Sequence, residues 1–142
     1  MNTVKQIDIW LKNEPGSLSN VSDVLGKNGI NIIAFCVTTE GDEGKLHFVA
    51  SDPEKAANVL KASGYTMDVK DVIACEVPHH PGGLNTVLKV LKNVNINVDN
   101  IYPCIGTGDI TILIVSVGPA EEAMKVLSEN WVRIFDESIY YM

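Results

Sequence analysis

Hydrophobic and polar residues alternate over residues 4–11 of the chain. One side of this segment carries Ile7 and Ile9, and the other side carries Gln6 and Asp8. A period of two residues is typical of a strand that buries one face. We therefore expect a half-buried strand whose polar side chains face the solvent.

The pattern then changes to that of a helix. Apolar residues recur every three or four positions from Leu18 to Leu25, and Gly29 follows as a helix stop. Next come two stretches rich in Ile, Val and Phe, at residues 30–39 and 44–51, on either side of an acidic turn that contains glycine. Two such stretches around a short turn predict a hairpin.

A second helix begins after this hairpin. Asp52 suits the N-cap and Pro53 suits the first helical position, and the helix is expected to end at Gly64. Residues 65–71 then predict a fourth strand. The resulting order, βαββαβ, is that of the ferredoxin-like motif, in which two helices pack on one face of a four-stranded antiparallel sheet.

The second half of the chain repeats the first. Pro-Gly-Ser-Leu at residues 15–18 returns as Pro-Gly-Gly-Leu at residues 81–84, an offset of 66 positions. Ile-Asn-Ile at residues 30–32 returns at the same offset as Ile-Asn-Val at residues 96–98. A constant offset between separate motifs indicates a tandem duplication.

The second copy predicts the elements of the first: strand 72–77, helix 83–94, strands 97–105 and 109–117, helix 119–130 and strand 132–136. The predicted fold class is therefore α+β, with two tandem ferredoxin-like βαββαβ units packed side by side, antiparallel sheets and the helices on one face. The expected domains are residues 1–71 and 72–142. The last four residues match the start of a further first strand, which predicts either a stub strand or a frayed tail.

Composition narrows the classes of protein. The 142 residues are 46% hydrophobic, and 11 basic and 18 acidic side chains give a net charge of -7. The hydrophobic fraction excludes disorder as the default. The acidic net charge argues against a nucleic-acid partner, because a protein that binds nucleic acid needs clustered Lys and Arg. Apolar runs stay short of the ~18 residues of a membrane span, and no basic-then-apolar leader opens the sequence, so a cytoplasmic protein without a membrane partner is expected.

The residues that carry chemistry are scattered. Three widely spaced cysteines without a CxxC motif are expected to be reduced packing residues, and the isolated Trp10 and Trp131 to serve core or interface packing. Adjacent His79 and His80 point apart and His47 belongs to another strand, so no metal site is expected. No nucleophile with its base, no paired acids and no dinucleotide fingerprint is visible, so we expect neither a catalytic residue nor a cofactor.

The turn at residues 13–18 permits ligand binding. A helix begins directly after Gly16, and its first turn presents unpaired N–H groups and the positive end of the helix dipole, which suit a carboxylate. The Asn31 amide offers a donor and an acceptor, as a zwitterion requires, and we expect it beside the first loop of the same or a neighbouring unit. Two plainer readings stay open, a tight strand-to-helix turn and an amide that only ties down the next strand.

Together these segments resemble a known family. Asn-x-Pro-Gly-x-Leu at residues 13–18, a helix, and Gly-Ile-Asn-Ile at residues 29–32 resemble the pattern of ACT domains, small regulatory modules that bind amino acids. The resemblance extends over both copies, from about Val4 to about Asp136. It implies a non-catalytic sensor that holds an amino acid at the interface between ACT units. The ligand-binding residues that it implies are Asn13, Gly16, Ser17, Leu18, Asn31 and Ile32, and in the second copy His79, Gly82, Gly83, Leu84, Asn97 and Val98.

Two departures distinguish the second copy, because His79 replaces Asn13 and Asn95 replaces Gly29. They indicate either an altered selectivity or a packing role. The implied partners are the amino-acid ligand, a second copy of the chain in a homodimer or higher homo-oligomer, and a target enzyme of amino-acid metabolism. The alternative is a ligand-free protein-interaction module or a regulatory subunit of an amino-acid biosynthetic enzyme.

Overall fold

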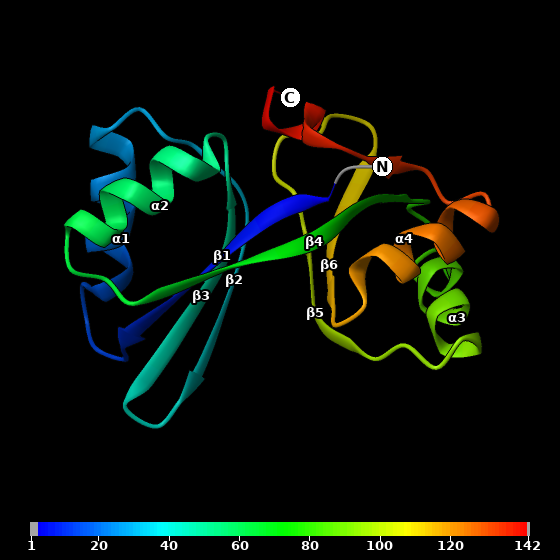
Figure 1. The fold of residues 1–142 in the computed structure, drawn as a ribbon, viewed down its shortest axis with the longest axis horizontal. Coiled ribbons are helices and arrows are strands. Elements are labelled where there is room, and N and C mark those ends of the chain that lie inside the picture. Colours follow the sequence, from blue (N-terminus) through cyan, green and yellow to red (C-terminus); the bar gives the residue numbers. More distant parts are fainter. Residues whose placement is uncertain (1–2, 142) are drawn as a thin grey trace. The chain divides into compact units, whose positions relative to one another are not determined.

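The computed structural model describes residues 3–141, which form two compact units (Figure 1). Residues 5–70 make the N-terminal unit, drawn from blue to green, and residues 71–141 with residues 3–4 make the C-terminal unit. Strand β4 (Met67–Val77) begins in the first unit and ends in the second.

The N-terminal unit is an antiparallel sheet covered by two helices. Its elements are β1 (Val4–Lys12), α1 (Ser17–Lys27), β2 (Ile32–Glu40), β3 (Glu43–Ala50), α2 (Pro53–Ala62) and the first residues of β4. Their order across the sheet is β2-β3-β1-β4. Val21 and Leu25 of α1 and Leu60 of α2 are fully or almost fully buried against Ile7 and Phe48 of the sheet, which places the core between the sheet and the helices.

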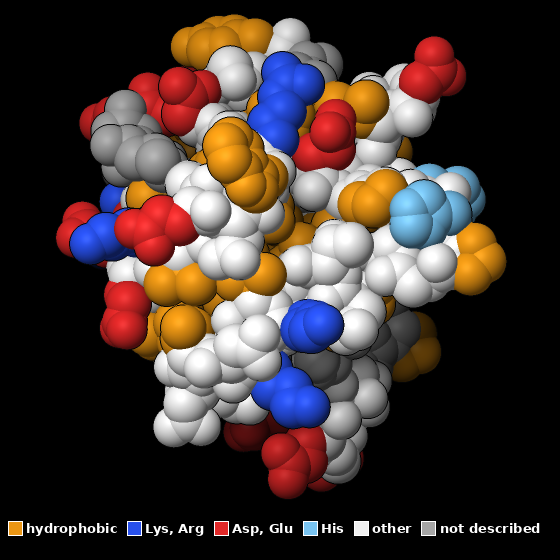
Figure 2. All heavy atoms as spheres, turned by 90° about the vertical axis from the view of Figure 1, so that its right-hand side faces the viewer, with side chains coloured by type: hydrophobic (Ala, Val, Ile, Leu, Met, Phe, Trp, Pro, Cys, Tyr) orange, Lys and Arg blue, Asp and Glu red, His pale blue; other side chains and the backbone are white. Residues whose placement is uncertain are grey.

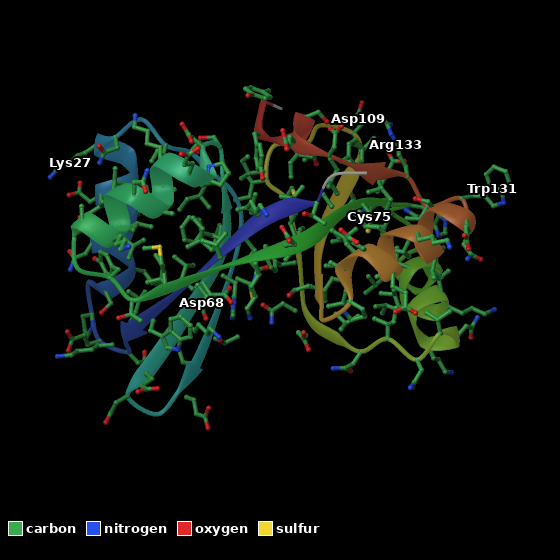
Figure 3. All side chains as sticks on the ribbon, in the orientation of Figure 1. Lys27, Asp68, Cys75, Asp109, Trp131 and Arg133 are labelled. Atoms are coloured by element: carbon green, nitrogen blue, oxygen red, sulfur yellow. The ribbon has the colours of Figure 1, made fainter. Side chains whose placement is uncertain are left out.

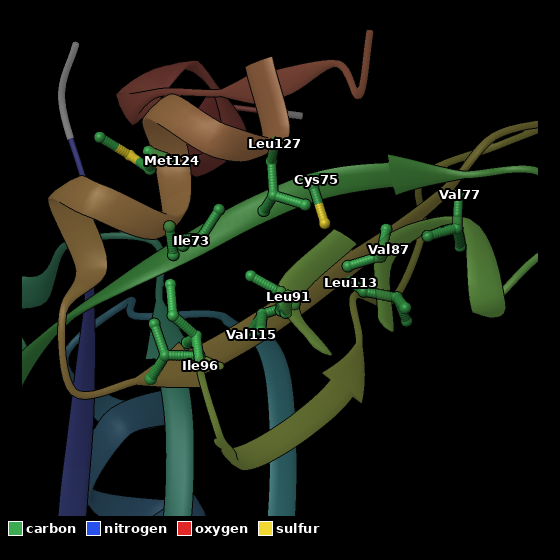
Figure 4. Packing of buried hydrophobic residues seen from close by; sticks show 12 residues of the cluster. Ile73, Cys75, Val77, Val87, Leu91, Ile96, Leu113, Val115, Met124 and Leu127 are labelled. Carbon is green, nitrogen blue, oxygen red and sulfur yellow. The ribbon is translucent and has the colours of Figure 1, made fainter. Parts of the chain in front are cut away.

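The C-terminal unit has the same design. Its elements are the later part of β4, α3 (Asn85–Asn93), β5 (Val98–Pro103), β6 (Thr111–Val117), α4 (Ala120–Glu129), β7 (Ile134–Phe135) and the 3-10 helix η1 (Glu137–Tyr141). The strand order is β5-β6-β4-β7. Figure 4 shows Leu91 of α3 and Leu127 of α4 packed on Ile73 and Cys75 of β4.

The predicted fold class is confirmed. Each unit shows the βαββαβ order with an antiparallel sheet and two helices on one face. Cys75 is a packing residue, as expected, and burial raises the pKa of its thiol to about 12, so it stays protonated. Cys36 and Cys104 are likewise free cysteines.

Some boundaries differ from the prediction. The strands expected at 65–71 and 72–77 form the single strand β4, because no turn residue separates Asp71 from Val72. Helix α3 begins at Asn85, two residues later than expected, since residues 81–84 are used in a turn. The strand expected at 132–136 pairs only over Ile134–Phe135.

The C-terminal segment is neither a stub strand nor a frayed tail. Residues Glu137–Tyr141 form η1, and Ile139 within it is only 1% exposed. The buried Ile139 side chain therefore anchors this segment. Met142 lies outside the described residues.

The polar side of β1 is the largest departure from the prediction. Gln6 and Asp8 are fully buried, so the expectation of a solvent-facing polar side is wrong. Asp8 Oδ1 accepts hydrogen bonds from Gln6 Nε2 at 2.8 Å and from His47 Nδ1 at 2.7 Å, and Lys70 Nζ lies 3.0 Å from Asp8 Oδ2. Burial raises the pKa of this carboxyl, but the donors His47, Lys70 and Gln6 outweigh it and lower the pKa to about 2.

Candidate functional site

The N-terminus of α1 is open to a ligand. Gly16 occupies the N-cap with φ 90°, a left-handed conformation that favours glycine, and no side chain caps the helix. The first turn contains no acidic residue, and the N–H groups of Leu18 and Ser19 donate to no acceptor within residues 3–141. This end of the helix therefore presents two amide donors and a positive partial charge without an internal acceptor.

Asn13 holds the loop before α1 in place. Its side-chain amide nitrogen donates to the Gly41 carbonyl at 3.0 Å, and its backbone N–H donates to the Asp42 carbonyl at 2.8 Å. Both bonds tie the end of β1 to the hairpin between β2 and β3. The side chain is nevertheless exposed, so its amide oxygen can still face a ligand.

Asn31 stands just before β2 with a free side chain. Its backbone N–H donates to Ser51 Oγ at 2.9 Å, and its carbonyl accepts from the Ser51 N–H at 2.8 Å. Ser51, which the sequence analysis missed, therefore holds this connection through the main chain. The exposed Asn31 amide makes no hydrogen bond within the described chain, which argues against a purely structural role.

Within one unit, Asn13 and Asn31 lie at opposite ends of the sheet. Lys12 pairs with Glu43 of β3, whereas Ile32 pairs with Ala50 of the same strand. The seven residue steps from Glu43 to Ala50 span about 23 Å at ~3.3 Å per step. Of the two alternatives, the first loop of the same unit is therefore excluded, and a position beside the first loop of a neighbouring unit stays a prediction.

The second copy has the same layout but a more closed helix start. Gly82 has φ 82°, as Gly16 has φ 90° in the first copy, but Gly83 is buried and a Cβ there would collide with the Pro78 carbonyl oxygen. The Asn85 N–H donates to the Gly82 carbonyl at 3.1 Å, and the Thr86 N–H donates to the Gly83 carbonyl at 3.1 Å. The N–H groups of Asn85 and Thr86 are therefore used by the turn itself, whereas the N–H of Leu84, the equivalent of Leu18, donates to no acceptor within residues 3–141.

The other second-copy positions are also separated. His79 and Leu84 are exposed at one end of the sheet. Asn97, exposed, and Val98, half-buried, lie at the other end, because Val77 pairs with Thr111 while Val98 pairs with Val117.

The replacement of Gly29 by Asn95 has a backbone explanation. Gly29 has φ 70° and Asn95 has φ 58°, so both residues occupy the left-handed region that ends a helix. Asn tolerates this region better than most residues do. The turn after the helix therefore keeps the same backbone conformation in both copies.

Comparison with known proteins identifies the family. A family model described as an ACT domain pair matches residues 2–140. The chain belongs to this ACT domain pair family. The ACT domain pair is 29% identical to protein BT0572 from Bacteroides thetaiotaomicron, with a TM-score of 0.89 over 98% of this chain and 96% of that one.

Two further solved structures share the fold of this ACT domain pair. The ligand-free regulatory subunit of aspartate kinase from Thermus thermophilus is 15% identical, with a TM-score of 0.67 over 92% of this chain and 94% of that one. The corresponding subunit from Thermus flavus is 17% identical, with a TM-score of 0.65 over the same shares. At these identities the likeness shows the fold alone. No curated protein matches the sequence.

Neither a metal cluster nor a membrane helix is found in the described part of this ACT domain pair. Within residues 3–141, no three His, Cys, Asp or Glu side chains are grouped so that they could hold a metal ion. None of the helices described there is long and apolar enough to cross a membrane.

Proposed function

We propose that this ACT domain pair is a non-catalytic regulatory protein that binds an amino acid at the interface between ACT units. The observation that carries the proposal is the open start of α1, where Gly16 leaves the N–H groups of Leu18 and Ser19 without acceptors. The regulatory subunits of aspartate kinase, which share the fold, support a regulatory role.

The ligand carboxylate would bind to the Leu18 and Ser19 amides, where the helix dipole stabilises negative charge. The Asn31 amide of a neighbouring unit would reach the same ligand, its oxygen accepting from the ammonium group. Because Asn31 lies at the opposite end of its own sheet, a complete site needs two units. Gly16, Ser17 and Ile32 shape the two halves of this site, and Asn13 holds its loop against the hairpin.

The second copy is proposed to act mainly as a packing partner. Its helix start leaves only the Leu84 N–H without an acceptor, where the first copy leaves two amides, and His79 stands where Asn13 anchors the first loop. Ligand binding would then change the affinity of the chain for a target enzyme of amino-acid metabolism, provided that the ligand prefers one of two conformations.

A thermal-shift screen against the twenty amino acids tests this proposal. A ligand at about 100 times its Kd adds about 2.7 kcal/mol to the free energy of unfolding, which raises the Tm by several degrees. We expect at least one amino acid to do so. Asn31→Ala should remove the shift, whereas Asn97→Ala, the matched change in the second copy, should retain it.

The proposal is wrong if no amino acid raises the Tm, or if Asn31→Ala and Asn97→Ala respond alike to the ligand. Far-UV circular dichroism of both variants checks that each one is folded. Neither residue supplies its side chain to a hydrogen bond within the described chain, so both variants should keep the native structure.

A second candidate is the ligand-free interaction module, and the edge strand β2 favours it. Phe35 and Val37 of this strand are 48% and 39% exposed, although both lie opposite core residues of β3. An exposed edge strand with apolar side chains invites pairing with another chain. A ligand screen without any response would favour this function.

A further inference from the structure

An open cleft of about 530 Å³ lies at one end of the C-terminal unit. Its walls come from the end of β4, the first turn of α3, the hairpin between β5 and β6, and the loop from α4 to β7. Of the twelve residues implied as ligand-binding by the family resemblance, only His79 lines this cleft. Its volume falls within the range of ~300–1,000 Å³ that small-molecule sites occupy.

At the same end of the N-terminal unit, Asn13 holds the first loop in place. There the two hydrogen bonds of Asn13 tie the end of β1 to the hairpin. His79 occupies the equivalent position in the second copy, and no hydrogen bond links it to the β5–β6 hairpin within the described residues. The cleft lies at this position, where such a tie is not found among the described residues.

The cleft carries charges of both signs on neighbouring strands. The Glu76 N–H donates to the Arg133 carbonyl at 3.0 Å, which sets the two side chains next to each other. Arg133 Nη1 lies 3.9 Å from Glu76 Oε1, too far for a hydrogen bond, and the guanidinium stacks over the Phe135 ring at 4.6 Å. Asp109 of the hairpin adds a second carboxylate (Figure 3).

This set of charges selects the class of ligand. Arg133 can bind a carboxylate through paired N–H donors, whereas Glu76 and Asp109 can accept from an ammonium group. A dianion would face two carboxylates, and a dication would face the guanidinium. A zwitterion satisfies both signs. Figure 2 shows acidic, basic, histidine and hydrophobic side chains spread over the side of the molecule that lies on the right in Figure 1.

Trp131 at the rim of the cleft indicates that the ligand carries an aromatic ring. Its side chain is 95% exposed and extends away from the ribbon in Figure 3. Its φ of 67° lies in the left-handed region, where a bulky residue is strained, whereas Gly64 occupies the equivalent position of the first copy with φ 90°. Packing explains neither the strain nor the exposure, but an exposed indole can stack on the ring of a ligand.

We propose that this cleft is a second binding site, which takes an aromatic zwitterion of the size of a free aromatic amino acid. Arg133 binds the carboxylate, Glu76 and Asp109 bind the ammonium group, and Trp131 contacts the ring. The site uses neither the start of α1 nor Asn31, so it stands independently of the site described under Proposed function.

The test compares three probes by calorimetric titration of the full chain. They are L-phenylalanine, 3-phenylpropanoate, which lacks the ammonium group, and phenethylamine, which lacks the carboxylate. We expect L-phenylalanine to bind at least tenfold more tightly than either analogue. Arg133→Gln and Glu76→Gln should each weaken its binding tenfold or more, whereas Lys89→Gln, a matched change of an exposed charge on α3, should change the Kd less than twofold.

The location is tested by fluorescence. In a Trp10→Phe variant, Trp131 is the only tryptophan left, and L-phenylalanine should change its emission when it is excited at 295 nm. Asn31→Ala should leave this change intact, which separates the cleft from the site at α1. Three results would overturn the proposal: no heat or emission change with L-phenylalanine, equal binding of all three probes, or an unchanged Kd in Arg133→Gln. Circular dichroism confirms that each variant is folded.

Discussion

The buried carboxylate of Asp8 links the stability of the N-terminal unit to pH. It is fully buried, yet His47, Gln6 and Lys70 surround it with donors at 2.7, 2.8 and 3.0 Å. These donors stabilise the fold only while the buried carboxyl group is ionised. Its pKa of about 2, against an ordinary value of 3.8, expresses this dependence.

The pH dependence follows from the sign of this shift. Because the folded pKa lies below the unfolded one, the contribution of Asp8 is fully present above pH 3.8 and is lost as the pH falls toward 2. The loss amounts to about 2 kcal/mol. Urea unfolding between pH 5 and pH 2 should show this decline. The Asp8→Asn variant should be less stable than the wild type at pH 5, and its free energy of unfolding should fall less between pH 5 and pH 2. The free energy of unfolding of Asp23→Asn, an exposed control, should fall with pH as it does in the wild type.

Trp131 gives a second prediction at the residue scale. Trp131→Gly should raise the free energy of unfolding by about 0.5–1 kcal/mol, because glycine relieves the strain at φ 67° and the lost indole is exposed. Gly64→Ala at the equivalent position should lower it by about 1 kcal/mol, since that backbone has φ 90°. Urea denaturation measures both. A destabilised Trp131→Gly would mean that the indole makes contacts in solution that the structure lacks.

At the scale of elements, the two strand-to-helix turns share a Pro-Gly sequence but differ in what they leave free. In the first copy the turn leaves two amides of α1 without acceptors. In the second copy Gly83 packs against the Pro78 carbonyl, and the turn uses the amides that begin α3. The second helix end therefore leaves one amide, that of Leu84, without an acceptor within residues 3–141, where the first leaves two.

Matched glycine substitutions test this difference. A Cβ at Gly16 meets no atom within 4 Å, so Gly16→Ala should lower the free energy of unfolding by only about 1 kcal/mol through backbone strain. A Cβ at Gly83 collides with the main chain of Pro78, so Gly83→Ala should lower it by about 3 kcal/mol. Equal losses in urea denaturation would show that the two turns are alike.

At the scale of the whole molecule, the proposed ligand site needs two units, because its halves lie at opposite ends of each sheet. A second copy of the chain can supply the missing half. The edge strand β2, with Phe35 and Val37 exposed, offers a surface on which such a copy could pair.

We therefore expect the chain to be a homodimer or larger. Multi-angle light scattering at micromolar concentration should give at least twice the mass of 15.4 kDa. Phe35→Glu should reduce that mass by placing a charge on the edge strand, whereas Leu84→Glu, an exposed leucine outside this strand, should not. A mass of one chain, with and without the ligand, would contradict the prediction.

The sequence by itself determined the order of elements, the duplication and the family. Helix and strand periods, turn residues and the offset of 66 are local or linear features, which can be read along the chain without knowing what it folds against. The merging of two predicted strands into β4 is an error of the same local kind, because it concerns a boundary.

Only the tertiary structure decided what surrounds each residue. Asp8 lies on the polar side of an alternating strand, and its burial depends on His47 and Lys70, which are far away in the sequence. Asn13 and Asn31 lie on either side of α1 in the sequence, but the pairing of both neighbouring strands with β3 sets them at opposite ends of the sheet. The cleft around Arg133 likewise depends on four segments that meet only after folding. Burial, distance and charge pairing are properties of neighbours in space, and those neighbours are set by the packing of distant segments.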